Sequence, residues 1–203
     1  MKAVVASRNR HKVAEIAVLL GGGPWQLVTI DELAPDAELR EDELTFDGNA
    51  LAKARQAAEA TGLPAFADDS GLEVDALNGD PGVRSARYAG DPCDDQRNND
   101  KLLLALRGVP AARRTARYRC SAAFVDLAHD LEVVRHGVCE GSILEVPRGT
   151  GGFGYDPLFE IVEYHRTFGT LSPQLKACIS HRARALRRLI PDLQRLAATE
   201  NWP

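Results

Sequence analysis

Short apolar, strand-like runs alternate along this chain with longer segments whose apolar residues recur every three or four positions. The helical segments are 13–20, 49–61, 95–106 and 173–189, and the strand-like segments are 3–6, 26–30, 65–67, 72–77, 115–126 and 131–143. Strands and helices that alternate in this way predict an α/β fold with a mixed sheet.

Two neighbouring acidic residues, Asp68 and Asp69, follow the apolar run 63–67. Adjacent side chains on an extended backbone point to opposite faces, so we do not expect the two carboxylates to share one role. Because Gly71 permits a turn directly afterwards, the pair is a candidate for holding a hard cation and orienting a water. The alternative is a solvated Asp-Ser-Gly turn.

The segment after the first strand is basic where helices usually carry acids, because the helix dipole is positive at its N-terminus. Four basic side chains crowd the start of the helix predicted over 13–20, namely Arg8, Arg10, His11 and Lys12. A bound anion such as phosphate would resolve this conflict. Ser7 and Asn9 add short hydrogen-bonding side chains to the same loop. The alternative is a solvated basic turn in which one of these two caps the helix.

Residues 148–157 form a glycine-rich segment, with four glycines in six residues between 149 and 154. Glycines let a backbone come close to a ligand. Phe153 and Tyr155 lie among them without the spacing of a core, and such rings can stack on a nucleobase. The alternative is a flexible turn whose aromatic side chains fold back onto the core.

A helix start is predicted at Ser172-Pro173, with the serine as N-cap and the proline at the first helical position. Lys176, His181 and Arg182 follow beside an apolar stripe. Taken alone, they also fit an ordinary basic helix face.

Composition limits the classes of protein that remain. The 203 residues are enough for one domain with a substantial core, and we expect a single domain over 1–203. The net charge of -4 argues against broad nucleic-acid binding. The run 3–6 is too short for a signal peptide or a membrane span. The 4 cysteines lack metal-site spacing and fit reduced thiols, so we expect a cytoplasmic protein without a membrane or nucleic-acid partner.

Six short motifs follow one another along almost the whole chain. They are Ser7-x-Asn9-x-x-Lys12, Thr45-Phe46-x-x-Asn49-Ala50-x-x-Lys53-Ala54, Ala67-Asp68-Asp69-Ser70-Gly71-Leu72, Pro81-Gly82 with Ser85-Ala86-Arg87-Tyr88, Gly151-Gly152-Phe153-Gly154-Tyr155-Asp156-Pro157, and Ser180-His181-Arg182. Six motifs in one order are far more specific than any single motif. With them, the chain resembles the inosine/xanthosine triphosphate pyrophosphatase family, the non-canonical purine nucleoside triphosphatases.

The resemblance implies Mg²⁺-dependent hydrolysis of non-canonical purine nucleoside triphosphates (ITP, dITP, XTP) to the nucleoside monophosphate and pyrophosphate, which cleanses the nucleotide pool. It implies that Asp69 orients or deprotonates the attacking water and that Glu41, Asp68 and Asp69 serve the metal. The residues implied to bind the substrate are Ser7, Asn9, Lys12 and Lys53 at the triphosphate, Phe153, Tyr155, Asp156, Lys176, His181 and Arg182 at the base and ribose, and Ser70. These residue types suit phosphoryl transfer, which needs cations on the oxygens and a placed nucleophile.

The resemblance also implies an elongated mixed central sheet flanked by helices, two lobes with the active site in the cleft between them, and a homodimer. One departure is Gly48, where the family usually has an acid directly before the Asn-Ala pair. We expect catalysis to survive it, because the metal site is assigned to Glu41 and Asp69. Two alternatives remain, a related nucleotide pyrophosphatase with a different base preference and a non-catalytic nucleotide sensor.

Overall fold

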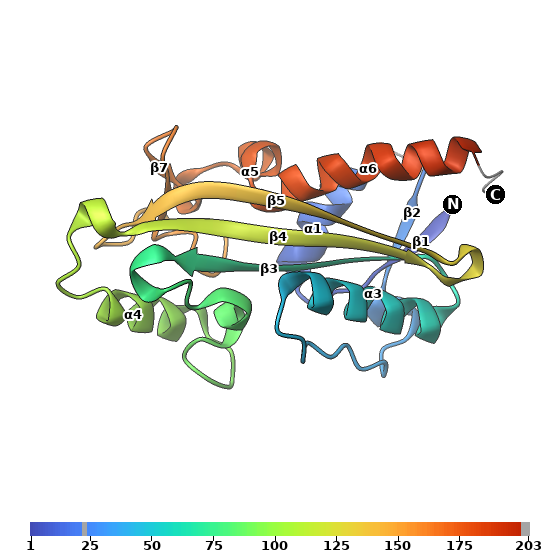
Figure 1. The fold of residues 1–203 in the computed structure, drawn as a ribbon, viewed down its shortest axis with the longest axis horizontal. Coiled ribbons are helices and arrows are strands. Elements are labelled where there is room, and N and C mark those ends of the chain that lie inside the picture. The colour runs from blue at the N-terminus through green and yellow to red at the C-terminus, as the bar shows by residue number, and fades with distance from the viewer. Residues whose placement is uncertain (22–23, 200–203) are drawn as a thin grey trace. The chain divides into compact units, whose positions relative to one another are not determined.

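The structure, a computed structural model, describes residues 1–21 and 24–199 (Figure 1). Within these residues, the strands form a seven-stranded sheet in the order β2-β1-β3-β4-β5-β6-β7. Their bounds are β1 Lys2–Val5, β2 Gln26–Thr29, β3 Ala65–Val74, β4 Thr115–Asp126, β5 Leu131–Ile143, β6 Phe159–Ile161 and β7 Arg166–Thr167. β1 pairs in parallel with β2 and β3, whereas β5, β6 and β7 pair antiparallel. The predicted α/β fold with a mixed sheet is confirmed.

The chain divides into two compact units, and the boundary between them falls inside β3, β4 and β5. Unit 1 comprises Met1–Asp69, Cys120–Gly137 and Arg182–Pro203, and unit 2 comprises Ser70–Arg119 and Val138–His181. A single domain over 1–203, and an active site in a cleft between two lobes, stay predictions.

Unit 1 has a core on each face of its strands. Alternate residues of β1 divide between them: Ala3 and Val5 pack with α1 (Arg10–Leu20) and α6 (His181–Thr199), and Val4 packs with α3 (Phe46–Thr61). Figure 1 shows α6 and α3 on opposite sides of the strands. The α3 side is lined mainly by alanines, whose small side chains let the helix lie close to the sheet.

Unit 2 has its own core, built from the strand segments of that unit and from α4 (Asp95–Ala105) and α5 (Pro173–Ile179). Leu72, Leu102 and Phe159 are fully buried in it. The remaining short elements are α2 (Ile30–Leu33) and 3₁₀ turns at Asp75–Leu77, Gly82–Arg87, Ala111–Arg113, Leu127–His129 and Phe168–Thr170. No helix in the described part of the chain is long and apolar enough to cross a membrane.

The alternative of an Asp-Ser-Gly turn after the acidic pair is wrong, and the separate strands predicted over 65–67 and 72–77 are joined, because residues 65–74 form one continuous strand. Asp68 and Asp69 remain extended within it because each carboxylate meets cationic partners from neighbouring helices. The predicted strand over 72–77 also ends early, since Asp75–Leu77 form a 3₁₀ turn.

Three predicted helices have different bounds in the structure. α1 begins at Arg10 rather than Val13, because the Asn9 side chain caps it. α3 begins at Phe46 with Thr45 as its N-cap. The helix predicted over 173–189 is two helices, since Ser180 has an extended conformation (ψ 160°) between α5 and α6. The predicted cap at Ser172 and the proline at the helix start are confirmed.

Candidate active site

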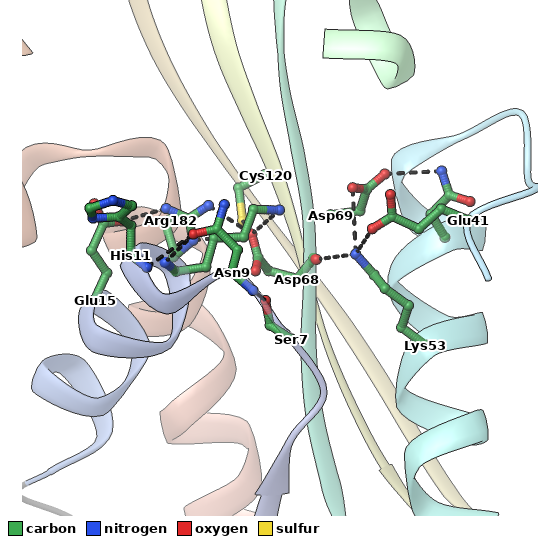
Figure 2. A network of polar contacts seen from close by, with 12 residues as sticks. Ser7, Asn9, His11, Glu15, Glu41, Lys53, Asp68, Asp69, Cys120 and Arg182 are labelled. Atoms are coloured by element: carbon green, nitrogen blue, oxygen red, sulfur yellow. Dashed lines mark hydrogen bonds and ion pairs between the residues drawn. The ribbon is translucent and has the colours of Figure 1, made fainter. Parts of the chain in front are cut away.

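The side chain of Asp69 points toward α3 and lies beside Glu41 and Lys53 (Figure 2). Together with Asn49 these residues form what we call the Asp69 cluster. Lys53 Nζ lies 3.6 Å from Asp69 Oδ1, forms an ion pair with Glu41, and donates a 2.7 Å hydrogen bond to the backbone carbonyl oxygen of Asp68. Asn49 Nδ2 donates a 3.0 Å hydrogen bond to Asp69 Oδ2. The cluster therefore holds two carboxylates on one buried ammonium group.

Burial and neighbouring charges together set the pKa values of Asp69 and Lys53. Burial raises the pKa of Asp69 above its ordinary value, and the neighbouring Glu41 adds to the rise, although Lys53 and Lys12 oppose it. Burial alone would lower the pKa of Lys53, but Asp69, Glu41 and Asp68 outweigh that effect and raise it. Lys53 therefore stays charged, while Asp69 accepts a proton more readily than an ordinary aspartate does.

The side chain of Asp68 points to the other face of β3, toward Arg182 and Glu15 (Figure 2). Together with Lys12 these residues form the Asp68 cluster. Arg182 donates to Asp68 Oδ2 through Nε at 3.1 Å and Nη2 at 2.9 Å, and its Nη1 bonds to Glu15. Lys12 Nζ lies 3.5 Å from the same Asp68 oxygen. The side chains of Asp68 and Arg182 are each 1% exposed, so this is a buried ion pair.

The surrounding positive charges determine the direction in which the pKa of Asp68 shifts. Burial by itself would raise its pKa, but Arg182, Lys12 and Lys53 hold the pKa of this carboxyl well below its ordinary value. The same pairing raises the pKa of Arg182 against its own burial. Asp68 is therefore a permanently charged counter-ion.

The strand period explains why the two clusters lie apart. Phe66 belongs to the core on the α1 and α6 side, whereas Ala65 and Ala67 belong to the core on the α3 side. Asp68 follows the parity of Phe66, and Asp69 follows that of its alanine neighbours. The sequence expectation that the two carboxylates face opposite ways is confirmed.

The basic loop before α1 has partners within the protein. Asn9 Oδ1 accepts hydrogen bonds from the backbone amides of His11 and Lys12, and Ser7 Oγ accepts one from the amide of Asn9. Arg8 forms an ion pair with Asp31. The capping alternative therefore describes Asn9, and triphosphate binding by Ser7, Asn9 and Lys12 stays a prediction.

In unit 2, Phe153, Asp156 and Lys176 form a compact group, which we call the Lys176 cluster. Lys176 Nζ donates a 2.6 Å hydrogen bond to Asp156 Oδ2 and lies 4.3 Å from the centre of the Phe153 ring. The same Asp156 oxygen accepts a 2.9 Å hydrogen bond from the amide of Phe153. A Cβ atom on Gly152 would lie 2.0 Å from this oxygen, so the glycine is needed for the loop to close around Asp156.

Three other predicted site residues have surroundings of their own. The Tyr155 hydroxyl donates a 2.8 Å hydrogen bond to the backbone oxygen of Ser85. The buried ring of His181 stacks on Tyr118 with ring centres 4.6 Å apart. Ser70 lies half-buried within β3. Substrate contacts by these residues stay predictions.

Two residues of the clusters received no role from the sequence. Asn49 lies in a quoted motif, but nothing in its spacing showed that its amide would reach Asp69. Glu15 pairs with Arg182 across 167 positions of the sequence, a separation at which no local pattern operates. Its only signal was its place three residues after Lys12, on the same helix.

A mixed α/β sheet that carries buried carboxylates, lysines and a basic loop defines a protein suited to phosphate chemistry. The chain belongs to the Ham1 family, whose model matches residues 3–192. A protein of Desulforamulus reducens named dITP/XTP pyrophosphatase is 51% identical over 196 residues, which cover 97% of each chain. The predicted resemblance is thereby confirmed, and the relatives bear the name of an enzyme.

Solved structures of the family share the fold. The structure of a HAM1 protein from Coxiella burnetii superposes with a TM-score of 0.87 at 42% identity, covering 96% of this chain and 99% of that one. The Staphylococcus aureus Ham1 protein gives a TM-score of 0.85 at 37% identity, covering 96% and 98% of the two chains.

Proposed function

We propose that this protein is a Mg²⁺-dependent pyrophosphatase that hydrolyses non-canonical purine nucleoside triphosphates, namely ITP, dITP and XTP, to the monophosphate and pyrophosphate. The observation that carries the proposal is the Asp69 cluster, in which a buried carboxylate with a raised pKa lies beside a charged lysine. Family membership and the names of the relatives support the substrate class.

The residues of the Asp69 cluster fit a magnesium ion. Among the described residues, no group of three or more His, Cys, Asp or Glu side chains could hold a metal by itself. Mg²⁺ typically takes only one or two protein carboxylates and completes its shell with water and substrate phosphates. Glu41 and Asp69, which meet at Lys53, supply those two carboxylates. When bound, the ion would neutralise phosphate charge and acidify a bound water.

Asp68 is the third proposed metal residue, and its surroundings differ. Its Oδ2 atom is held by Arg182, whereas its Oδ1 atom has no hydrogen-bond partner among the described atoms although it is buried. That oxygen is the acceptor left for a water or a cation. A metal role for Asp68 stays a prediction.

In the proposed reaction, Asp69 accepts a proton from the attacking water, a role suited to a carboxylate whose pKa burial has raised. Lys53 holds Asp69 and stabilises charge that develops on the phosphate oxygens. Ser7, Asn9 and Lys12 are the remaining proposed phosphate ligands, with Ser70 as a further substrate contact.

The Lys176 cluster is the proposed site for the base. Phe153 offers a ring for stacking, and Lys176 offers donors for the 6-oxo group of hypoxanthine and xanthine, where adenine carries a donor of its own. Tyr155, Asp156 and His181 are proposed to complete the surroundings of base and ribose. Arg182 was predicted to contact the base as well, and this stays a prediction because its guanidinium already donates to Asp68 and Glu15.

The test is a substrate panel. Pyrophosphate release should be fast with ITP, dITP and XTP plus Mg²⁺, very slow with ATP, and absent in excess chelator. Fast turnover of a pyrimidine nucleotide instead would favour the alternative of a related pyrophosphatase with another base preference. Binding of ITP without pyrophosphate release would favour the non-catalytic sensor, and release of orthophosphate would contradict the proposed bond cleavage.

We further propose that the protein acts as a cytoplasmic homodimer with no nucleic-acid or membrane partner. Light scattering on the purified protein tests the dimer directly, since a mass of about one chain would contradict it.

A further inference from the structure

The buried side chain of Asn49 links Asp69 to the segment that precedes α3. Asn49 is 1% exposed. Its Oδ1 accepts a 2.9 Å hydrogen bond from the backbone amide of Glu43, and its Nδ2 donates a 3.0 Å hydrogen bond to Asp69 Oδ2. Because a backbone amide can only donate, it fixes the oxygen end of the carboxamide and thereby directs the nitrogen end toward Asp69.

Gly48, directly before Asn49, leaves room for this link. A Cβ atom at position 48 would lie 2.8 Å from Glu43 Cβ and 3.0 Å from Glu43 Cγ. The nearer of these atoms is attached to the backbone, so rotating the Glu43 side chain cannot remove the contact. Gly48 is not among the residues with positive φ, so the glycine is required for space.

Hydrogen bonds at the start of α3 hold the backbone of Gly48 and Asn49 in place. The amide of Gly48 donates to Thr45 Oγ1 at 3.0 Å, and the amide of Asn49 donates to the backbone oxygen of Thr45 at 3.1 Å. A side chain at position 48 would therefore displace the Glu43 amide rather than the helix.

We propose that Asn49 is a positioning residue that fixes the orientation of the Asp69 carboxylate, and that Gly48 stays small so that the Glu43 amide can hold Asn49. This inference rests on the proposed function of the Asp69 cluster. It gives the departure at position 48 a structural reason, because an acid there would clash with Glu43.

The first experiment compares Asn49→Asp, Asn49→Ala and a matched control, Gln56→Ala. The aspartate keeps the acceptor for the Glu43 amide, loses the donor to Asp69 and adds a negative charge beside it, whereas the alanine removes both hydrogen bonds without adding a charge. Gln56 is a carboxamide of the same helix that accepts a 2.8 Å hydrogen bond from the backbone amide of Arg40, in the same segment. With dITP and Mg²⁺, kcat should fall on the order of 10–100-fold in both Asn49 variants. KM should stay within about threefold, and the control should keep wild-type kcat.

The second experiment tests the role of Gly48 by rescue. Gly48→Ala should lower kcat, and Glu43→Gly in the same chain should restore most of it, because it removes the two nearest atoms and leaves only Thr45 Oγ1, at 3.1 Å from the new Cβ. Glu43→Ala should restore less, since its Cβ remains. Unfolding temperatures measured in parallel separate lost activity from lost folding.

Wild-type kcat in Asn49→Asp would overturn the inference, as would an equal loss in Gln56→Ala or a change confined to KM. If neither Asn49 variant folds, Asn49 is a structural residue and the inference fails. These outcomes concern the positioning role alone when the wild type releases pyrophosphate. A wild type without that activity would instead contradict the proposed function.

Discussion

Asp68 and Asp69 are neighbours in the chain and opposites in their surroundings. Asp68 faces two donors of Arg182 and the ammonium group of Lys12, and its pKa lies well below the ordinary value. Asp69 shares Lys53 with a second carboxylate, and its pKa lies above the ordinary value. Burial raises the pKa of both carboxyls; the cations around Asp68 outweigh that effect, whereas those around Asp69 do not.

This contrast supports the proposal that Asp69, and not Asp68, accepts the proton in the reaction. A carboxylate that a guanidinium holds through two hydrogen bonds is a poor proton acceptor, and it stabilises the fold by neutralising a buried cation. A carboxylate whose charge is less fully compensated accepts a proton more readily. On the proposed function, the two adjacent acids of β3 would have different tasks, one on each face of the strand.

The largest effect on stability is expected from Asp68→Asn, which leaves the buried Arg182 with one fewer counter-charge. Breaking a buried ion pair in this way should lower the free energy of unfolding by roughly 3–5 kcal/mol. Urea unfolding at neutral pH measures it. Asp31→Asn is the control, because the exposed Arg8–Asp31 pair should contribute less than about 1 kcal/mol. Equal losses in the two variants would contradict the structural role of Asp68.

Lys53→Ala tests the Asp69 cluster, which lies on the opposite face of β3 from Asp68. It removes the cation that Glu41 and Asp69 share, so kcat/KM for dITP should fall by roughly 10²–10³-fold. The control is Lys101→Ala. In the wild type the Lys101 ammonium group lies over the Tyr88 ring and donates a hydrogen bond to the backbone oxygen of Tyr88. A loss of similar size in the control would show that any missing lysine has this effect.

A smaller effect is expected from Phe153→Ala. Loss of a stacking ring should weaken binding of every purine substrate by about 1–3 kcal/mol, because stacking does not read the 6 position. KM for ITP and XTP measures this loss, with the exposed Tyr164 changed to alanine as the control. Unchanged KM values would remove Phe153 from the proposed base site.

The smallest effect is the pH dependence of stability that Asp68 confers. Its pKa is lower in the folded than in the unfolded protein, so its contribution is complete above the unfolded value of about 3.9. Below that value the contribution declines by up to about 1.4 kcal/mol per pH unit. The difference in unfolding free energy between wild type and Asp68→Asn should therefore narrow as the pH falls through about 4. A difference independent of pH would contradict the assignment.

Local patterns predicted much of the fold. The strands over 115–126 and 131–143 have the predicted bounds, because long apolar and alternating runs determine them. The continuous strand β3 was not predicted, since two adjacent acids normally favour a turn. It forms because Arg182, 114 positions further along the chain, neutralises Asp68, and no local pattern carries that information.

In the candidate site, too, local patterns predicted some features, whereas others depend on contacts between distant segments. The strand period was enough to place the two carboxylates on opposite faces, and the structure brings together Glu41, Lys53 and Asp69, all of which the sequence had named as site residues. The pairing of Arg182 with Asp68 and Glu15, and the amide link through Asn49, depend on contacts between distant segments. Such contacts become visible only in the folded chain.

The central claim is that Asp69 acts in the reaction while its neighbour Asp68 holds the fold, and kcat of Asp69→Asn with dITP and Mg²⁺ tests it most directly. The variant keeps the shape of the side chain and removes its charge and basicity. We predict a fall in kcat of roughly 10²–10⁴-fold, with a free energy of unfolding no lower than that of the wild type. A folded Asp69→Asn protein with near-wild-type kcat would contradict the account.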